Sequence, residues 1–261
     1  MVTHEETTPV QVGAGQITAR EADAERWVYP LAAANAHERG FASERADLSR
    51  SPAIAACGER LSAASGLAID QIDHLDLYSC FPSAVQMARD ALGIAAHDSR
   101  PLTVTGGLAY HGGAGNNYCT HAIAEVMVRI RADRSATGLV SGVGWYMSKH
   151  SRGLYGGRPP AGGWRPIDTA TLQAEIDAGP VVDVVAQGKG KGRIETYTVM
   201  HDRADGPVQG IVLGRLSDGR RFVANTPTDI DLLDAMTNEE FLDRAGRVHN
   251  DGKRNLFTPD A

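Results

Sequence analysis

A glycine-rich stretch at residues 106–121 constrains the fold of this chain more than any other feature. Five glycines fall between positions 106 and 115, a β-like run at 101–105 precedes them, and an apolar run with helical periodicity follows at 122–130. Glycine permits positive φ and carries no Cβ, so its backbone can approach a ligand closely. A helix that begins after such a loop offers unpaired N–H groups to an anionic or carbonyl oxygen. The order of strand, glycine loop and helix is that of a ligand-binding loop or of a tight structural turn.

Polar side chains within this stretch favour the ligand-binding loop. They are His111, Asn116, Asn117, Tyr118 and His121. Both asparagines can donate to a carbonyl oxygen, and they can equally cap the following helix. The residues that we expect to meet the ligand are Gly112, Gly113, Asn116 and Asn117.

The composition limits the classes of partner. The 261 residues suggest one large domain or two modest ones. The net charge of −6 argues against a nucleic-acid or anionic-membrane surface, and no apolar run approaches the ~20 residues of a membrane helix. Residues 1–8 do not resemble a signal peptide. Cys57, Cys80 and Cys119 lack metal-ligand spacing and indicate free thiols. We therefore expect a cytoplasmic protein without a metal, a nucleic-acid partner or a membrane partner.

Residues before the middle of the chain alternate between helix-like and strand-like runs. Ser51 and Pro52 suit the N-cap and first turn of a helix, and Gly66 suits its end. Residues 32–50 show little periodicity, so no regular element is predicted there. The other expected elements are strands at 9–17, 74–78, 137–145 and 149–155, the last two as antiparallel neighbours, and a second helix over 84–92 that ends at Gly93.

The pattern changes after a linker rich in glycine and proline at residues 156–163. Asp-Gly turns between alternating runs are a strong hairpin signal. Several short strands with one inserted helix fit a small Greek-key barrel of the oligonucleotide/oligosaccharide-binding (OB) type. The expected strands are 181–186, 192–201, 208–216, 220–224 and 244–249, with a helix at 229–236. The predicted division is a strand and linker at 1–24, a first domain at 25–157, a linker and short helix at 158–180, and an OB-like domain at 181–261.

Short sequence segments between residues 25 and 155 carry a family resemblance. In order they are ERWVYPLAAANAHE, SERADLSRSPAI, DLYSCFPSAVQ, TVTGGLAYHGGAGNNYCTHAIAE and GLVSGVGWYMSKHS. In amino-acid sequence and in spacing along the chain, these segments resemble the C-terminal half of the thiolase superfamily. The closest branch is the thiolase-like proteins related to sterol-carrier-protein thiolases, of the acetyl-CoA acetyltransferase type. The later segment at residues 192–227 resembles the additional OB-like C-terminal domain of one such branch.

The resemblance implies an α/β fold, with a layered sheet-and-helix half followed by a small OB-like β-barrel. It also implies CoA or an acyl-CoA as the ligand, with no permanently bound cofactor. Thiolases perform Claisen chemistry on acyl-CoA, which requires a nucleophile, a proton-transfer group and a place for developing negative charge. In the family the nucleophilic cysteine comes from the N-terminal half. Here the resemblance passes from a first strand at 9–16 to the start of the second half at residue 26, with no room for that segment.

Three loops that supply catalytic groups in the family depart from its pattern. Residues 78–81 read Tyr-Ser-Cys-Phe, where the family has Asn-Glu-Ala-Phe or His-Asp-Cys-Phe. Gly113 stands at the histidine of the Gly-His-Pro loop, with His111 two residues before it. Val140 stands at the cysteine of the Cys-x-Gly loop, and a valine cannot transfer a proton. The resemblance therefore implies a thiolase-like protein that lacks standard thiolase catalysis.

Three residues are the candidates for any remaining chemistry. Cys80 lies in a strand-to-helix turn, where a helix N-terminus can lower the pKa of a thiol. Tyr78 can donate its O–H to a thioester oxygen, and His111 can act as an acid or base. Each also has a structural explanation, as a buried cysteine, a buried tyrosine with a satisfied hydroxyl and an ordinary loop histidine.

Alternative functions follow from these candidates. One is an active acyltransferase or retro-aldolase of acyl-CoA and lipid metabolism that uses Tyr78, Cys80 and His111. Another is a non-enzymatic module that docks on an acyl-CoA enzyme, and half of a thiolase fold favours a homo-oligomer or a partner protein. A basic group in the OB-like part has too few aromatic neighbours for a base-stacking platform, which indicates a solvated strand face. Its members are Lys189, Lys191, Arg193, Arg220 and Arg221.

Overall fold

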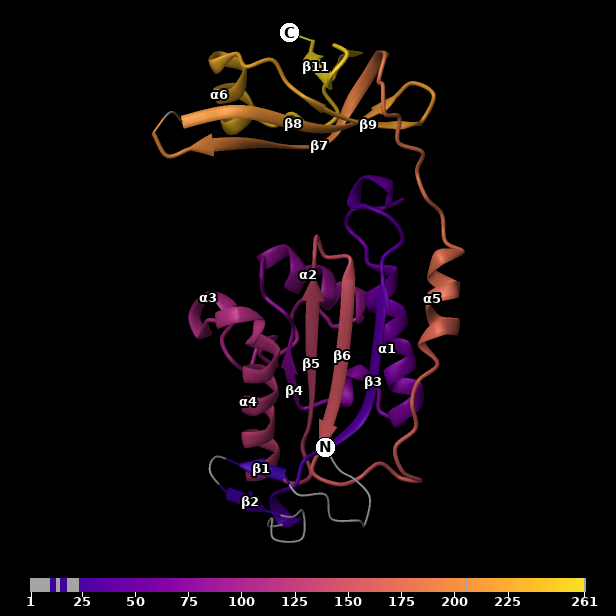
Figure 1. Ribbon diagram of the computed structural model, residues 1–261, viewed down its shortest axis with the longest axis vertical. Coiled ribbons are helices and arrows are strands. Elements are labelled where there is room, and N and C mark those ends of the chain that lie inside the picture. Colours follow the sequence, from indigo (N-terminus) through magenta and orange to yellow (C-terminus); the bar gives the residue numbers. More distant parts are fainter. Residues whose placement is uncertain (1–9, 13–14, 18–23, 205, 261) are drawn as a thin grey trace. The chain divides into compact units, whose positions relative to one another are not determined.

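The chain forms two compact units. The computed structural model describes residues 10–12, 15–17, 24–204 and 206–260 (Figure 1). The first unit runs to Glu38 and continues from Asp47 to Gly179, and the second contains Arg39–Ala46 and the residues from Pro180 onward. Residues 39–46 thus belong to the second unit and not to the first domain, which was predicted at 25–157. No described helix is both long and apolar enough to cross a lipid bilayer.

The first unit is built on a four-stranded sheet with the order β3-β6-β5-β4 (Figure 1). Its strands are β3 (Tyr29–His37), β4 (His74–Asp76), β5 (Thr137–Gly144) and β6 (Lys149–Gly156). β4 is parallel to β5, whereas β6 is antiparallel to both β5 and β3. The expected antiparallel pair of strands near 137–145 and 149–155 is therefore confirmed.

Helices cover both faces of this sheet. They are α1 (Pro52–Ser65), α2 (Pro82–Ala91), α3 (Leu108–His111), α4 (Tyr118–Ala132) and α5 (Thr169–Asp177). Leu139 and Leu154 belong to the core cluster that includes α1, whereas their neighbours Val140 and Tyr155 pack with α4. Successive side chains of a strand point to opposite faces, so α1 and α4 lie on opposite faces of the sheet.

Shorter elements complete the first part of the chain. The single strand predicted over 9–17 is wrong, because β1 (Val10–Val12) and β2 (Gly15–Ile17) pair antiparallel as a hairpin. Residues 9, 13 and 14 of that prediction lie outside the described residues. Single turns of 3-10 helix occur at Ala24–Arg26, Ala42–Glu44, Ile69–Gln71 and Ala114–Asn116.

Strand β3 contradicts the prediction of an irregular segment from residue 32 onward. Ala32, Ala34 and Ala36 are buried, while the residues between them are exposed. This alternation has the period of two that a strand requires. The prediction failed because alanine carries the apolar positions, and alanine is depleted in strands.

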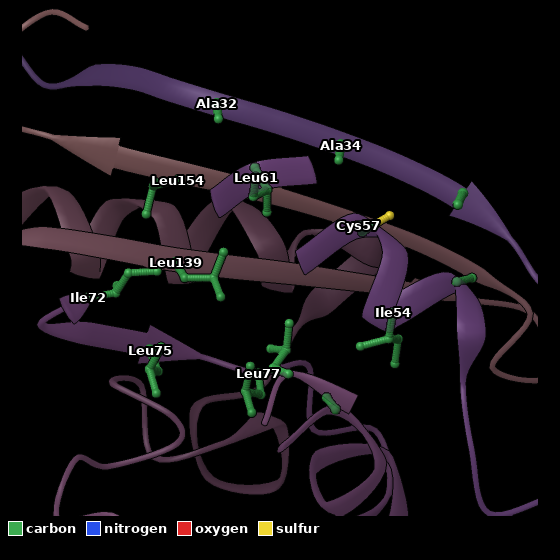
Figure 2. Packing of buried hydrophobic residues seen from close by; sticks show 14 of the residues in the cluster. Ala32, Ala34, Ile54, Cys57, Leu61, Ile72, Leu75, Leu77, Leu139 and Leu154 are labelled. Atoms are coloured by element: carbon green, nitrogen blue, oxygen red, sulfur yellow. The ribbon is translucent and has the colours of Figure 1, made fainter. Parts of the chain in front are cut away.

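The core of the first unit lies between α1 and the sheet (Figure 2). Ile54, Cys57 and Leu61 of α1 meet Leu139 and Leu154 of the sheet in one buried cluster. Fully burying a leucine or isoleucine stabilises the fold by about 1.5–3 kcal/mol. The small alanines of β3 join the same cluster and add little bulk beneath α1.

Helix α1 begins and ends as its sequence predicts. The Ser51 Oγ accepts a hydrogen bond from the Ile54 N–H at 3.2 Å, and Pro52 occupies the first turn. Gly66 ends the helix in the left-handed conformation, with φ of 73°. The Ser51 hydroxyl is buried and also donates to the Glu38 carboxylate at the end of β3. One side chain therefore caps the helix and satisfies a buried acid.

We expect Ser51→Ala to lower the free energy of unfolding by about 1–2 kcal/mol, because it removes an N-cap acceptor and a partner of Glu38. Urea denaturation followed by circular dichroism measures this change. Ser83→Ala, in the exposed first turn of α2, is the matched control and should leave stability nearly unchanged. Equal stability of the two variants would contradict the capping function of Ser51.

The second unit contains a small closed β-barrel with the strand order β10-β11-β9-β8-β7. Its elements are β7 (Gly190–Asp202), β8 (Gly206–Leu216), β9 (Arg221–Asn225), α6 (Ile230–Asn238), β10 (Ala245–Asn250) and β11 (Asn255–Pro259). β7 pairs with both β8 and β10, and β11 contacts β9 in a parallel bridge between Leu256 and Asn225. The helix lies between the third and fourth strands of the barrel.

A small β-barrel after the α/β part is thus confirmed, and its OB type remains a prediction that the Greek-key strand order supports. Two details of the prediction are wrong. Residues 181–186 make only isolated bridges rather than a strand, and β11 was missed. The segment of β11 is short and begins with a polar asparagine, which anchors it by hydrogen bonds to Ala186 O and Val223 O.

Arg221 holds residues 39–46 within the second unit. Its side chain is fully buried, which contradicts the solvated basic group predicted from the sequence. Its Nε and Nη2 donate to the Glu195 carboxylate at 2.6 and 2.5 Å, and its Nη1 donates to the backbone oxygens of Ser43 and Arg45. The Val182 N–H adds a bond to Glu44 O at 2.9 Å. The segment between β3 and α1 is therefore part of the barrel unit.

We expect Arg221→Met to destabilise the barrel unit by about 3–5 kcal/mol at neutral pH, because it leaves Glu195 and two backbone oxygens without this partner. The hydrogen bond from Arg221 lowers the pKa of Glu195. A lowered pKa stabilises the fold above the unfolded value and loses that effect as pH falls. The gap between wild type and variant should therefore shrink as the pH falls below about 4.

Denaturation curves at several pH values test this expectation. Arg220→Met changes the exposed neighbour, which pairs with Asp218, and should leave unfolding unchanged within error. A gap between wild type and Arg221→Met that stays constant with pH would contradict the proposed interaction with Glu195.

Candidate functional site

A cavity of about 690 Å³ opens on the face of the sheet that also carries α4. In register across the strands, Asn35 lies beside Ser151 and His37 lies beside Lys149, so these side chains share one face. Gly142 pairs with Ser151 in the same row. The other residues that line the cavity are Tyr78, Cys80, Phe81, Asn116, Cys119, Val143, Gly144, Trp145 and His150.

Gly142 forms a tight part of this cavity wall. A Cβ at this position would lie 2.6 Å from Ser151 Oγ and 3.2 Å from Cys119 Sγ. Both distances are too short for ordinary contacts, so a side chain here would displace its neighbours. The absence of a side chain at the buried Gly142 therefore lets the Ser151 hydroxyl and the Cys119 thiol pack close against this part of the cavity wall.

A buried polar network holds the glycine loop beside the cavity. Asp76 at the end of β4 is fully buried, and its Oδ2 accepts from the Thr105 N–H at 3.1 Å and from the Thr105 hydroxyl at 2.9 Å. The Thr105 hydroxyl also lies 2.6 Å from the Tyr118 hydroxyl. The Ser79 Oγ accepts from the Leu108 N–H at 2.8 Å. The network thereby connects β4, the loop and the start of α4.

The glycine loop differs from the predicted strand, loop and helix in two ways. The run at 101–105 makes one antiparallel bridge, Thr103 with Asp76, and not a strand. The long helix begins at Tyr118, and two short helical turns precede it. Gly107, with φ of 96°, and Gly113 require glycine, since a Cβ on Gly113 would lie 2.9 Å from the Cβ of Tyr118. The loop is thus packed against the start of α4.

The structure brings only some of the predicted site residues together. Tyr78, Cys80 and Asn116 line the cavity, whereas His111, Gly112, Gly113 and Asn117 are not among its lining residues. His111 is exposed, with its ring centroid 5.1 Å from that of His121. Neither asparagine caps α4 with its side chain. Roles for all seven residues in ligand binding or catalysis remain predictions.

Several lining residues were not named as candidates from the sequence, among them Asn35, His37, Lys149 and Ser151. These four polar residues occupy alternate positions on two strands, the period expected for one face of a sheet. This alternation can be read from the predicted strand at 149–155. It could not be read at residues 35 and 37, because no strand was predicted there.

The surroundings of the cavity favour the protonated forms of Cys119 and Tyr78. Burial raises the pKa of the Cys119 thiol, and the negative charge of Asp76 raises it further. Burial likewise raises the pKa of Tyr78. A protonated thiol is a poor nucleophile, whereas a protonated phenol can donate a hydrogen bond to a carbonyl oxygen. This combination suits binding of a carbonyl group better than attack on it.

We expect the stability of Asp76→Asn relative to wild type to increase between pH 4 and pH 8. Burial raises the pKa of Asp76, so wild type loses stability as the pH rises through the folded pKa. Asparagine retains an acceptor for Thr105 and does not ionise. Denaturation at a series of pH values measures the trend. Glu195→Gln should show the opposite trend and only below about pH 4.5, because the pKa of Glu195 is lowered from its usual value of 4.5. A relative stability of Asp76→Asn that falls with pH would contradict the assignment.

Two comparisons with known proteins, together with this fold, classify the chain as thiolase-like. Residues 171–253 match the family model of the thiolase-like protein type 1 additional C-terminal domain. The fold of most of the chain is similar to that of a solved protein, which confirms the resemblance and the α/β class inferred from the sequence.

That solved protein is a monomeric SCP2-thiolase like protein type 1 from Mycobacterium smegmatis. The two structures agree with a TM-score of 0.84 and 37% sequence identity, over 92% of this chain and 52% of the relative. The chain therefore spans about half the length of this relative. No curated protein matches the chain in sequence.

Proposed function

We propose that the first unit binds an acyl thioester of the acyl-CoA type in the cavity, and that it does not perform standard thiolysis. The observation that carries the proposal is the position of the cavity, whose wall contains Tyr78 and Cys80 from the first of the thiolase-type loops. Its volume of about 690 Å³ lies within the range of small-molecule sites.

The cavity wall offers donors suited to a carbonyl group. The Tyr78 hydroxyl, the Asn116 amide and the Ser151 hydroxyl are neutral groups with N–H or O–H donors. Cys119 and the bare backbone of Gly142 lie beside Ser151. A thioester carbonyl is weakly basic and uncharged, so neutral donors of this kind match it without a large cost of desolvation.

The loss of thiolysis is supported by what replaces the family's catalytic side chains. Gly113 stands at the histidine position, and a Cβ there would lie 2.9 Å from the Cβ of Tyr118, so a histidine does not fit this backbone. Val140 stands at the cysteine position and packs in an apolar cluster with Ala122 and Val126 of α4. Neither position can supply a proton-transfer group to the cavity.

An active enzyme is the second candidate, because both Tyr78 and Cys80 line the cavity. In that case Cys80 would accept the acyl group and Tyr78 would polarise the carbonyl. His111 lies outside the lining, so a base for Cys80 would have to come from another group. Release of free CoA thiol from acetyl-CoA, abolished by Cys80→Ala and by Tyr78→Phe, would favour this candidate over binding alone.

We expect millimolar acetyl-CoA to raise the melting temperature of the protein, because a ligand that binds only the folded state stabilises it. Gly142→Ala should reduce the shift strongly, since its methyl group would displace Ser151 and Cys119 from their positions in the cavity wall. Ser83→Ala, at an exposed position of α2 outside the cavity lining, is the control and should leave the shift unchanged. An unchanged melting temperature in wild type, or equal shifts in both variants, would contradict binding in this cavity.

A further inference from the structure

The charge of the cavity differs from that of the chain as a whole. The chain carries a net charge of −6, yet the residues that line the cavity include Lys149 and His37 and no carboxylate. The second lining histidine, His150, has a buried side chain whose Nε2 lies 3.5 Å from Glu38 Oε1. A basic side chain at the mouth of a concave site, without an acid to neutralise it, attracts anions. The question is then whether Lys149 is available to a ligand.

Lys149 is exposed at the first position of β6. Its ammonium lies 5.7 Å from the centroid of the Trp145 ring, a distance typical of a cation–π contact. Within the described part of the chain, no carboxylate forms an ion pair with it. The ammonium therefore retains hydrogen-bond donors for a bound anion.

His37 stands directly opposite Lys149 in the register of β3 and β6. Gln173 of α5 fixes this end of β3, because its Oε1 accepts from the His37 N–H at 2.8 Å and its Nε2 donates to His37 O at 3.1 Å. The imidazole is consequently held on the same face of the sheet as the ammonium. Two nitrogen-bearing side chains thus meet at one edge of the cavity.

Aromatic side chains border this basic pair. Trp145 and Phe81 line the cavity with 74% and 63% of their surfaces exposed. Trp145 also has φ of 54°, and Met147 in the same turn has φ of 53°. Left-handed conformations of non-glycine residues are strained and concentrate at functional sites. The turn between β5 and β6 thereby presents an indole ring beside the ammonium.

We propose that Lys149 and His37, with Trp145 beside them, form a subsite for an anionic oxygen group of the thioester ligand. This inference rests on the proposed function and names a charged group that the ligand must carry. The group is a phosphate, as on the nucleotide end of an acyl-CoA, or a carboxylate at the far end of a dicarboxylic acyl chain. Both accept charge-assisted hydrogen bonds from an ammonium.

Thermal-shift titrations of wild type and Lys149→Gln with four probes test the subsite. The probes are acetyl-CoA, succinyl-CoA, S-acetyl-pantetheine and S-succinyl-pantetheine. The loss of a charge-assisted hydrogen bond should weaken binding of the recognised anions about tenfold or more. If phosphate is recognised, both CoA esters weaken and both pantetheine esters are unaffected. If an acyl carboxylate is recognised, both succinyl esters weaken and acetyl-CoA does not.

Two control variants make the result specific. Lys253→Gln removes the same charge from the turn between β10 and β11 and should bind all four probes like wild type. Lys149→Arg retains the charge and should recover part of the affinity, with a dependence on salt that Lys149→Gln lacks.

The outcomes separate this inference from the proposed function. If no probe shifts the melting temperature of wild type, the proposed function fails and the subsite fails with it. If all four probes bind wild type and Lys149→Gln equally, the proposed function stands and the anionic subsite is overturned.

Discussion

The buried carboxylate of Asp76 is the interaction on which the candidate site depends. Its Oδ2 accepts two hydrogen bonds from Thr105, and the Thr105 hydroxyl passes the network on to Tyr118 at the start of α4. A glycine-rich loop has little side-chain packing of its own, and fixing its backbone costs conformational entropy. Bonds from the core to Thr105, and from Ser79 to Leu108, supply the missing restraint. The cost is a buried acid whose pKa is raised by its surroundings. Burial raises the pKa of the Cys119 thiol, and the negative charge of Asp76 adds to that effect.

A second constraint fixes the segment between β3 and α1. Arg221 is buried with Glu195 and donates to two backbone oxygens in residues 39–46, so this segment folds with the barrel although the strand and helix on either side of it belong to the first unit. A guanidinium is suited to this task because its planar fork can bind a carboxylate and carbonyl oxygens at once. The chain therefore passes between its two units at residues 38–39, 46–47 and 179–180. Two of these crossings lie close in sequence to His37, which lines the cavity.

The cavity combines neutral donors in its wall with a basic and aromatic edge. In the proposed function, Tyr78, Asn116 and Ser151 bind a carbonyl group, and Lys149 with Trp145 binds an anion attached to it. At the two positions where thiolases carry proton-transfer residues, this chain carries residues that take part in packing. Val140 fills the apolar cluster beneath α4, and Gly113 allows Tyr118 to approach the loop. Both residues therefore contribute to the packing of α4 against the sheet and the glycine loop.

The sequence by itself determined the local elements whose signals are short range. Ser51, Pro52 and Gly66 specify the ends of α1 through a hydroxyl acceptor, a missing N–H and a left-handed glycine, and the Asp-Gly turns indicated the hairpins of the barrel. The segments that resemble the thiolase superfamily singled out Tyr78 and Cys80, and both residues line the cavity. Tertiary structure alone decided that β3 is a strand, because its buried alanines become apolar positions only when α1 packs on them. It also decided that His37 and Lys149 face one cavity while His111 does not. Residues more than a hundred positions apart meet through sheet register, and register depends on long-range pairing that no local pattern encodes.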